Sequence, residues 1–299
     1  MTARNSSAWL TCSLYVALTV ATLWPLGPSF ASEFESNFID LAEVHGFSED
    51  PAEVSKTWEH GYVFVPGSFI GEFTYGKMAS ASIQSRLNEI PDDIHYPLIV
   101  YLHDAGGVSA KVYRLLKELD VENFAAVLPD SFARNGRKSD CEGRASNPDN
   151  CAMSPEVYLF RRAELIYAVR AASRLSWVDQ DNVFLAGSGE GAVAVALWGG
   201  VVDVSGYIII DWTCTAPAEF PWFNGLRVPS NRPTLVLTTS QSRWADMPGW
   251  DGNCAEKAEA RANVDALAID TSIRDVFRLR EGKRAILEFL YANRRAHTN

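Results

Sequence analysis

The stretch FLAGSGEGAVAVA, residues 184–196, has the glycine spacing of a turn that can carry a nucleophilic serine. In the G-x-S-x-G pattern, the serine sits on a sharp turn between a strand and a helix, where its hydroxyl is exposed for attack. Aligned on Gly187 and Gly191, the pattern places Gly189 at the serine position, and Ser188 lies one residue too early. The sequence therefore predicts a catalytic turn that lacks its catalytic side chain.

A sheet must position this turn, and short apolar runs supply its strands. These runs alternate with segments of helical spacing, which predicts an α/β fold with a mostly parallel sheet and helices on both faces. The predicted strands are Tyr96–Leu102, Phe124–Pro129, Asn182–Gly187, Gly206–Asp211, Pro233–Thr239 and Ala266–Asp270. The predicted helices are Ser109–Glu118, Pro155–Arg174, Gly191–Trp198 and Gly282–Asn293. Loops at the strand ends are expected to build the functional site.

The chain has 299 residues, of which 47% are hydrophobic and 21% charged, and this suits one large α/β domain. Its beginning is different, because Arg4 alone is charged before an apolar run over Trp9–Leu23. Small residues at Ser29 and Ala31 then match a signal-peptide cleavage site. We predict a signal peptide over residues 1–31 and a single domain over residues 32–299. A membrane anchor is the alternative, although the apolar run is short for a span.

The net charge of −10 bears on the choice of partners. Loss of Arg4 with the signal peptide makes the remaining chain more negative, and its Lys and Arg residues are scattered. Such a chain repels phosphate backbones and anionic lipids. We therefore expect no nucleic-acid partner, no membrane contact after cleavage and no cofactor, in a periplasmic or secreted protein whose protein partner is unknown.

Four cysteines remain after residue 31, and an even number in an exported chain favours disulfides. Cys141 and Cys151 bracket the polar loop CEGRASNPDNC and can pair, which leaves Cys214 and Cys254 for each other. The sequence has neither a C-x-x-C motif nor clustered histidines, so no metal site is expected.

The order of these landmarks resembles an α/β-hydrolase of the dienelactone-hydrolase-like group, over roughly Tyr96 to Leu290. YPLIVYLHDAGG looks like the strand and oxyanion loop of that group, and VLPDSFARNG followed by Cys141 looks like its next loop. WVDQDNVFLAG leads into the turn as it does in the group. The resemblance implies an α/β-hydrolase fold and a triad in which the acid follows a late strand and the histidine follows the last one.

Carried over to this chain, the resemblance implies that all three triad positions are substituted. LVLTTSQSRW, matched on Trp244, puts the acid position on Ser242, and DTSIRDVF puts the histidine position on Arg274. Serine carries no charge that could stabilise an imidazolium, and arginine cannot accept a proton near neutral pH. Asp246 or Asp251 is an alternative acid if the alignment is shifted in this loop.

The remaining parts of the site predict a binding pocket. The backbone N–H of Glu190 and the loop at Asp104 and Ala105 would form an oxyanion-like corner, and Arg274 would project toward it. We predict a pseudoenzyme whose cleft takes a small anionic or carbonyl ligand. In the alternative, Arg274 pairs with Glu190 or Asp275 and fills the cleft.

Two other functions stay open at this stage. The chain would be an ester or lactone hydrolase if Ser188 attacked with His103 as its base. It would be a protein-interaction module if tryptophans in the late loops formed an exposed rim, whereas the same residues could line an apolar pocket or pack a cap over the sheet. These tryptophans are Trp212, Trp222, Trp244 and Trp250.

Overall fold

The computed structural model describes residues 50–137, 155–242, 244, 247–258 and 263–295. The predicted signal peptide and the predicted Cys141–Cys151 disulfide lie outside these residues, so both stay predictions. Among the described helices, none combines the length and the apolar character that crossing a membrane requires.

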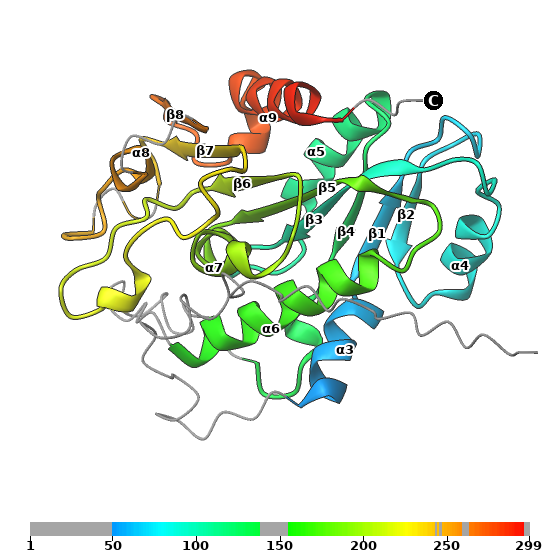
Figure 1. Cartoon of the computed structure of the whole chain (residues 1–299), viewed down its shortest axis with the longest axis horizontal. Coiled ribbons are helices and arrows are strands. Elements are labelled where there is room, and N and C mark those ends of the chain that lie inside the picture. Colours follow the sequence, from blue (N-terminus) through cyan, green and yellow to red (C-terminus); the bar gives the residue numbers. More distant parts are fainter. Residues whose placement is uncertain (1–49, 138–154, 243, 245–246, 259–262, 296–299) are drawn as a thin grey trace, which may run out of the picture. The chain divides into compact units, whose positions relative to one another are not determined.

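One mixed sheet of eight strands forms the centre of the described chain, in the order β2-β1-β4-β3-β5-β6-β7-β8 (Figure 1). Strands from β4 to β8 run parallel, and β1 is antiparallel to both of its neighbours. The strands are β1 (Tyr62–Val65), β2 (Thr74–Lys77), β3 (Tyr96–Leu102), β4 (Ala125–Leu128), β5 (Val178–Ser188), β6 (Gly206–Ile210), β7 (Thr234–Thr239) and β8 (Val264–Ile269). All six predicted strands are confirmed, while β1 and β2 were not predicted.

Helices cover both faces of the sheet, as predicted. Figure 1 shows α5 and α9 on one face and α3, α6 and α7 on the other. The helices are α3 (Pro51–Glu59), α4 (Ala81–Leu87), α5 (Ala110–Val121), α6 (Pro155–Ala172), α7 (Glu190–Trp198), α8 (Cys254–Lys257) and α9 (Arg280–Asn293). The four predicted helices match α5, α6, α7 and α9, whereas α3, α4 and α8 were not predicted.

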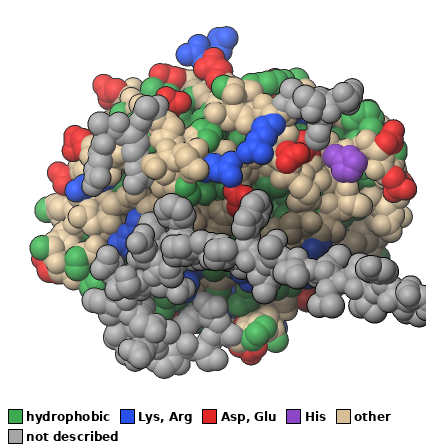
Figure 2. All heavy atoms as spheres, in the orientation of Figure 1, with side chains coloured by type: hydrophobic (Ala, Val, Ile, Leu, Met, Phe, Trp, Pro, Cys, Tyr) green, Lys and Arg blue, Asp and Glu red, His purple; other side chains and the backbone are tan. Residues whose placement is uncertain are grey.

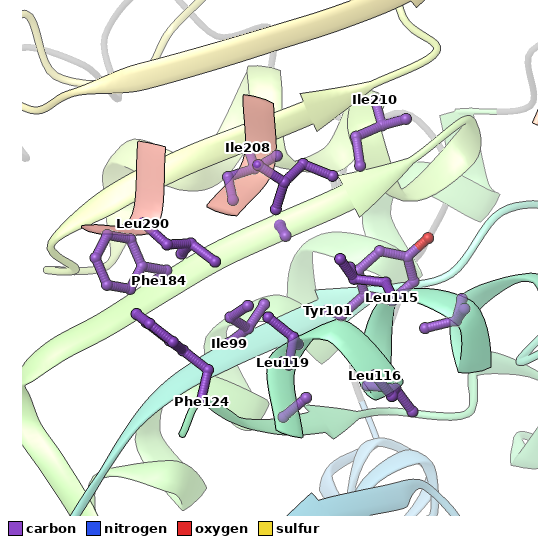
Figure 3. Packing of buried hydrophobic residues seen from close by; sticks show 14 of the residues in the cluster. Ile99, Tyr101, Leu115, Leu116, Leu119, Phe124, Phe184, Ile208, Ile210 and Leu290 are labelled. Atoms are coloured by element: carbon purple, nitrogen blue, oxygen red, sulfur yellow. The ribbon is translucent and has the colours of Figure 1, made fainter. Parts of the chain in front are cut away.

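Buried hydrophobic residues pack on both faces of the sheet, and Figure 3 shows the cluster between the sheet and the helices of one face. Every residue of β3 is buried, as expected for a central strand covered on both faces. Helix α5 buries Val112, Leu115, Leu116 and Leu119, which is the spacing of one helical face. Leu115 and Leu119 belong to the same buried cluster as Ile99 and Tyr101 of β3. Full burial of each such side chain stabilises the fold by about 1.5–3 kcal/mol.

The described surface carries no broad basic patch on the face shown in Figure 2, where Lys and Arg side chains lie in small groups among acidic and polar ones. This distribution agrees with the acidic net charge of the whole chain.

The late loops are held by a disulfide and by packed indoles. Cys214 and Cys254 form the predicted bond across 40 residues. Beside it, Trp212 packs edge-on against Trp244 with ring centroids 4.8 Å apart, and Trp250 is also buried. Three of the four tryptophans thus pack a cap, and none of the four lines the cleft described below. These three do not form an exposed rim, whereas Trp222 is half-buried, and the interaction-module alternative stays a prediction.

Replacing both Cys214 and Cys254 by alanine should lower the free energy of unfolding by about 2–4 kcal/mol, because the bond restricts a long loop in the unfolded chain. Chemical denaturation of the variant and of the wild type would measure the difference. If the variant and the wild type unfolded at the same denaturant concentration, the bond would contribute little to stability.

Candidate functional site

The predicted turn is present at the carboxyl end of the central strand. Strand β5 ends at Ser188, α7 begins at Glu190, and Gly189 forms the apex with φ 50° and ψ −113°. A positive φ is uncommon for residues other than glycine. The flanking glycine is also required, because a Cβ at Gly191 would lie only 2.2 Å from the carbonyl oxygen of Leu102. The backbone therefore has the shape of a nucleophile elbow, and its apex has no side chain.

A cleft of about 620 Å³ opens above this apex and contains both Gly189 and Arg274. Its volume suits a small ligand. Its polar lining residues are Tyr101, Asp104, Ser109, Lys111, Ser188, Asp211, Ser272, Arg274, Asp275 and Arg278. None of the described residues that line the cleft is a histidine or a cysteine. The structure thus places two of the three positions that the resemblance assigns to the triad, Gly189 and Arg274, in one cleft.

Arg274 has a different partner from those expected. Its Nη2 lies 3.6 Å from Oδ2 of Asp211, and its side chain is 46% exposed. Asp275 instead accepts a hydrogen bond of 2.9 Å from Arg114, and the Glu190 carboxylate faces a buried cluster described below. The expected pairing of Arg274 with Glu190 or Asp275 is therefore wrong. The physical reason is that both carboxylates already have closer cationic partners.

Asp211 is a site residue that the sequence analysis missed. It directly follows β6 and adopts φ 60°, a conformation that aspartate and asparagine visit more readily than most residues. Its N–H donates to the carbonyl of Leu237 at 2.8 Å, and its own carbonyl accepts from Nε1 of Trp244 at 2.7 Å. These bonds fix the backbone that presents its carboxylate to Arg274. The sequence signal that could have identified Asp211 is an acidic residue directly after a buried strand.

Ser188 forms a hydroxyl pair with Tyr101 at the floor of the cleft. The Tyr101 hydroxyl donates to Oγ of Ser188 across 2.8 Å, and both residues line the cleft although they are largely buried. Burial raises the pKa of the Tyr101 phenol, so the phenol stays protonated and serves as a donor. Tyr101 therefore cannot serve as a base for Ser188 near neutral pH.

His103, the proposed base for Ser188, is engaged on both ring nitrogens. Its Nε2 accepts from the N–H of Ser131 at 3.0 Å, so its Nδ1 carries the proton and donates to the Asp104 carbonyl at 2.6 Å. Burial, and secondly the charge of Arg161, lower the pKa of His103 well below its usual range. The structure thus holds His103 as a neutral packing residue and does not assemble the pair of Ser188 and His103.

A buried cluster of charges lies behind the elbow. Glu190, the first residue of α7, pairs with Arg137, and its Oε1 lies 3.7 Å from Nε of Arg161. Arg161 of α6 also donates to Glu164 at 2.9 Å and to the carbonyl of His103 at 2.7 Å. Opposite charges in this cluster offset part of the cost of burying each of them. The Glu190 carboxylate thus anchors α7, which leaves only its backbone N–H for the predicted role in the cleft.

The loop at Asp104 and Ala105 borders the cleft beside the elbow, as expected. A Cβ at Gly189 would lie 3.2 Å from Cβ of Asp104. Asp104 accepts the N–H of Gly106 at 2.8 Å, and its other oxygen lies 3.5 Å from Nζ of Lys111. Lys111 thereby adds a cation to the cleft that the sequence analysis did not include.

The predicted acid position lies away from the cleft lining. Ser242 is buried, and its Oγ accepts the N–H of Trp244 at 3.3 Å, which closes a turn after β7. Asp251 is exposed and does not line the cleft, and Asp246 is outside the described residues.

Two helices direct their N-termini toward the cleft. Residues Gly107, Ser109 and Lys111 at the start of α5 line it, as does Gly189 at the start of α7. Neither Ser109 nor Gly189 caps its helix through a side chain. The first N–H groups of a helix have no intrahelical acceptor and carry partial positive charge. This end of the sheet therefore favours an anion.

The topology and the elbow together define the α/β-hydrolase fold: a mostly parallel eight-stranded sheet carries the turn between its central strand β5 and helix α7. The described chain has this fold.

Several solved structures of hydrolases are similar to this chain. A structure named as a dienelactone hydrolase from Klebsiella pneumoniae is similar at 14% identity, covering 67% of this chain and 88% of that one, with a TM-score of 0.43. An esterase from Pyrobaculum calidifontis matches at 14% identity over 90% and 98% of the chains (TM-score 0.47). A glucuronoyl esterase from Teredinibacter turnerae matches at 13% identity over 67% of each (TM-score 0.47). No family model and no curated protein matches the chain.

Proposed function

We propose that this chain is an exported, catalytically silent protein of the α/β-hydrolase fold, whose cleft binds a small anionic or carbonyl ligand. The observation that carries the proposal is the joint presence of Gly189 at the elbow apex and Arg274 in the same cleft. The apex provides no group that can attack, and the guanidinium accepts no proton.

The expected loss of activity is large. Removal of the nucleophile alone costs on the order of 10⁶ in kcat in a serine protease, and binding with an oxyanion hole alone leaves about 10³ over water. Ser188 is a poor replacement because its hydroxyl is bonded to Tyr101 and His103 is engaged elsewhere. A retained cleft without a nucleophile supports binding rather than turnover.

The polar groups of the cleft indicate what would bind. The two helix N-termini and the half-exposed Arg274 favour an anionic group. The Ser188 hydroxyl accepts its hydrogen bond from Tyr101, so its own proton can be donated to a carbonyl oxygen of the ligand. A carboxylate or a small ester therefore has the matching chemistry.

Export rests on two features. Cys214 and Cys254 form a disulfide, which persists mainly in oxidising compartments. The first residues have the composition and the cleavage site of a signal peptide.

Calorimetric titration with acetate and with methyl acetate tests the proposal. We expect the wild type to bind at least one of these probes, and Arg274→Gln to weaken acetate binding by about tenfold, because a charge-assisted contact is lost. Arg284→Gln is the matched control, since Arg284 pairs with Glu288 on the surface of α9 and does not line the cleft.

An assay with a short activated ester accompanies this titration. The wild type should not exceed the uncatalysed rate by more than about 10³, the contribution of binding and an oxyanion hole alone, and Ser188→Ala should leave this rate unchanged. Turnover that disappeared in Ser188→Ala would overturn the silent assignment in favour of an esterase that uses Ser188.

A further inference from the structure

The cation that would receive an anionic ligand is already paired with a carboxylate of the same chain. Nη2 of Arg274 and Oδ2 of Asp211 are 3.6 Å apart, which is too long for a good hydrogen bond. The Arg274 side chain is nearly half exposed, whereas that of Asp211 is largely buried. A long contact at such a half-exposed position is weak and is screened by solvent. The pair can therefore open when a competing anion arrives.

We propose that the ligand of the cleft is a carboxylate and that it competes with Asp211 for Arg274. The inference rests on the proposed function, in which the cleft binds a small anion, and it adds the ligand class and the residue that limits affinity. The Asp211 side chain is itself a carboxylate presented to the guanidinium inside the cleft. A free carboxylate can do the same with two parallel hydrogen bonds, which the fork of an arginine matches.

The two partners differ in how firmly they are held. The backbone of Asp211 is fixed by its bonds to Leu237 and Trp244, directly after a buried strand. Arg274 lies in the loop after β8 and reaches Asp211 with a long side chain. When a ligand binds, the Arg274 side chain is therefore the part that turns, while the Asp211 carboxylate remains as a nearby negative charge. Asp211 thus lowers affinity both by occupying the guanidinium and by repelling the ligand.

The carboxylate of Asp275 provides a comparison. Asp275 also lines the cleft and is similarly buried, but it holds Arg114, which does not line the cleft. Removing the charge of Asp275 changes the net charge of the cleft by the same amount without releasing Arg274. The two substitutions therefore separate direct competition from general repulsion.

The experiment is a calorimetric titration of acetate into the wild type, Asp211→Asn and Asp275→Asn. Asparagine adopts the left-handed conformation that position 211 requires, and it keeps the size of the side chain. We expect Asp211→Asn to bind acetate about tenfold more tightly than the wild type, and Asp275→Asn to change the affinity by less than about threefold. Inorganic phosphate is the second probe. Its affinity should rise less than the affinity for acetate when Asp211 is replaced by asparagine.

Each result decides the matter. If the wild type binds acetate and Asp211→Asn binds it equally or less tightly, competition by Asp211 is refuted while the proposed function stands. If Asp211→Asn increases the affinity for phosphate more than the affinity for acetate, the ligand is not a carboxylate. If neither protein binds acetate or methyl acetate, the proposed function itself fails. Should circular dichroism show Asp211→Asn to be misfolded, Asp211→Gly replaces it, because glycine also accepts this backbone conformation.

Discussion

The double variant Gly189→Ser/Arg274→His should hydrolyse a short activated ester at least about a hundredfold faster than either single variant. A complete triad contributes on the order of 10⁶ in kcat, so even a poorly aligned one should be detectable. Position 189 has the backbone of a nucleophile elbow, and position 274 shares its cleft. Steady-state kinetics on all three variants would measure the gain.

Asp211 supplies the third part of this repair. Because Arg274 already contacts Asp211, a shorter imidazole at position 274 would have a carboxylate near it to orient the ring. Serine at position 189 would adopt a positive φ and would approach Cβ of Asp104 closely, at a cost of about 1–3 kcal/mol in stability. The repaired protein should thus be active and less stable.

Two controls decide whether the gain has the expected origin. Adding Asp211→Asn to the double variant should remove most of the new activity if the carboxylate orients the base. Gly189→Ser alone should remain near background because no base is present. Robust activity of that single variant would show that another residue accepts the proton, and the role given to position 274 would be wrong.

Arg161→Met should lower the free energy of unfolding by about 3–5 kcal/mol, because it removes the cation that two fully buried carboxylates share. The Arg161 side chain is fully buried and contacts Glu164, Glu190 and the carbonyl of His103. Methionine keeps much of the length and the apolar stem. Urea denaturation followed by circular dichroism would measure the loss.

The chain contains a matched control for this substitution. Arg284 pairs with Glu288 one helical turn away, and both side chains are about two-thirds exposed. Arg284→Met should therefore cost only a small fraction of the loss at Arg161, because surface pairs contribute little. Adding Glu164→Gln to Arg161→Met should recover part of the stability, because it removes a buried carboxylate that has lost its closer cation, Arg161. If Arg161→Met and Arg284→Met lowered the free energy of unfolding equally, burial would not be the reason that the cluster stabilises the fold.

The sheet was predictable from sequence because its central strands are continuous apolar runs. Tyr96–Leu102 matches β3 residue for residue, and the other predicted strands differ only at their ends. The apolar run of β1 has only four residues, fewer than the six-residue run that marked β4, and β2 contains Gly76 and Lys77 and has no apolar run, so neither gave a clear pattern.

The site was predictable where short motifs fix the backbone and unpredictable where distant residues meet. Flanking glycines identified the apex, and the DVF anchor placed Arg274, which the structure puts in the same cleft. The partner of Arg274 was missed because Asp211 lies far away in sequence and is brought close only by the sheet. Arg161 and Glu164 look like an ordinary surface pair at helical spacing, and only tertiary packing buries them.

The glycine at the elbow apex also affects how many destabilising substitutions the domain can tolerate. A side chain there would hold the backbone in an unfavourable region, whereas Gly189 adopts φ 50° without that penalty. The difference of about 1–3 kcal/mol is comparable to the loss caused by one ordinary point mutation. A domain with glycine at this position can therefore accumulate roughly one more damaging substitution elsewhere before it unfolds.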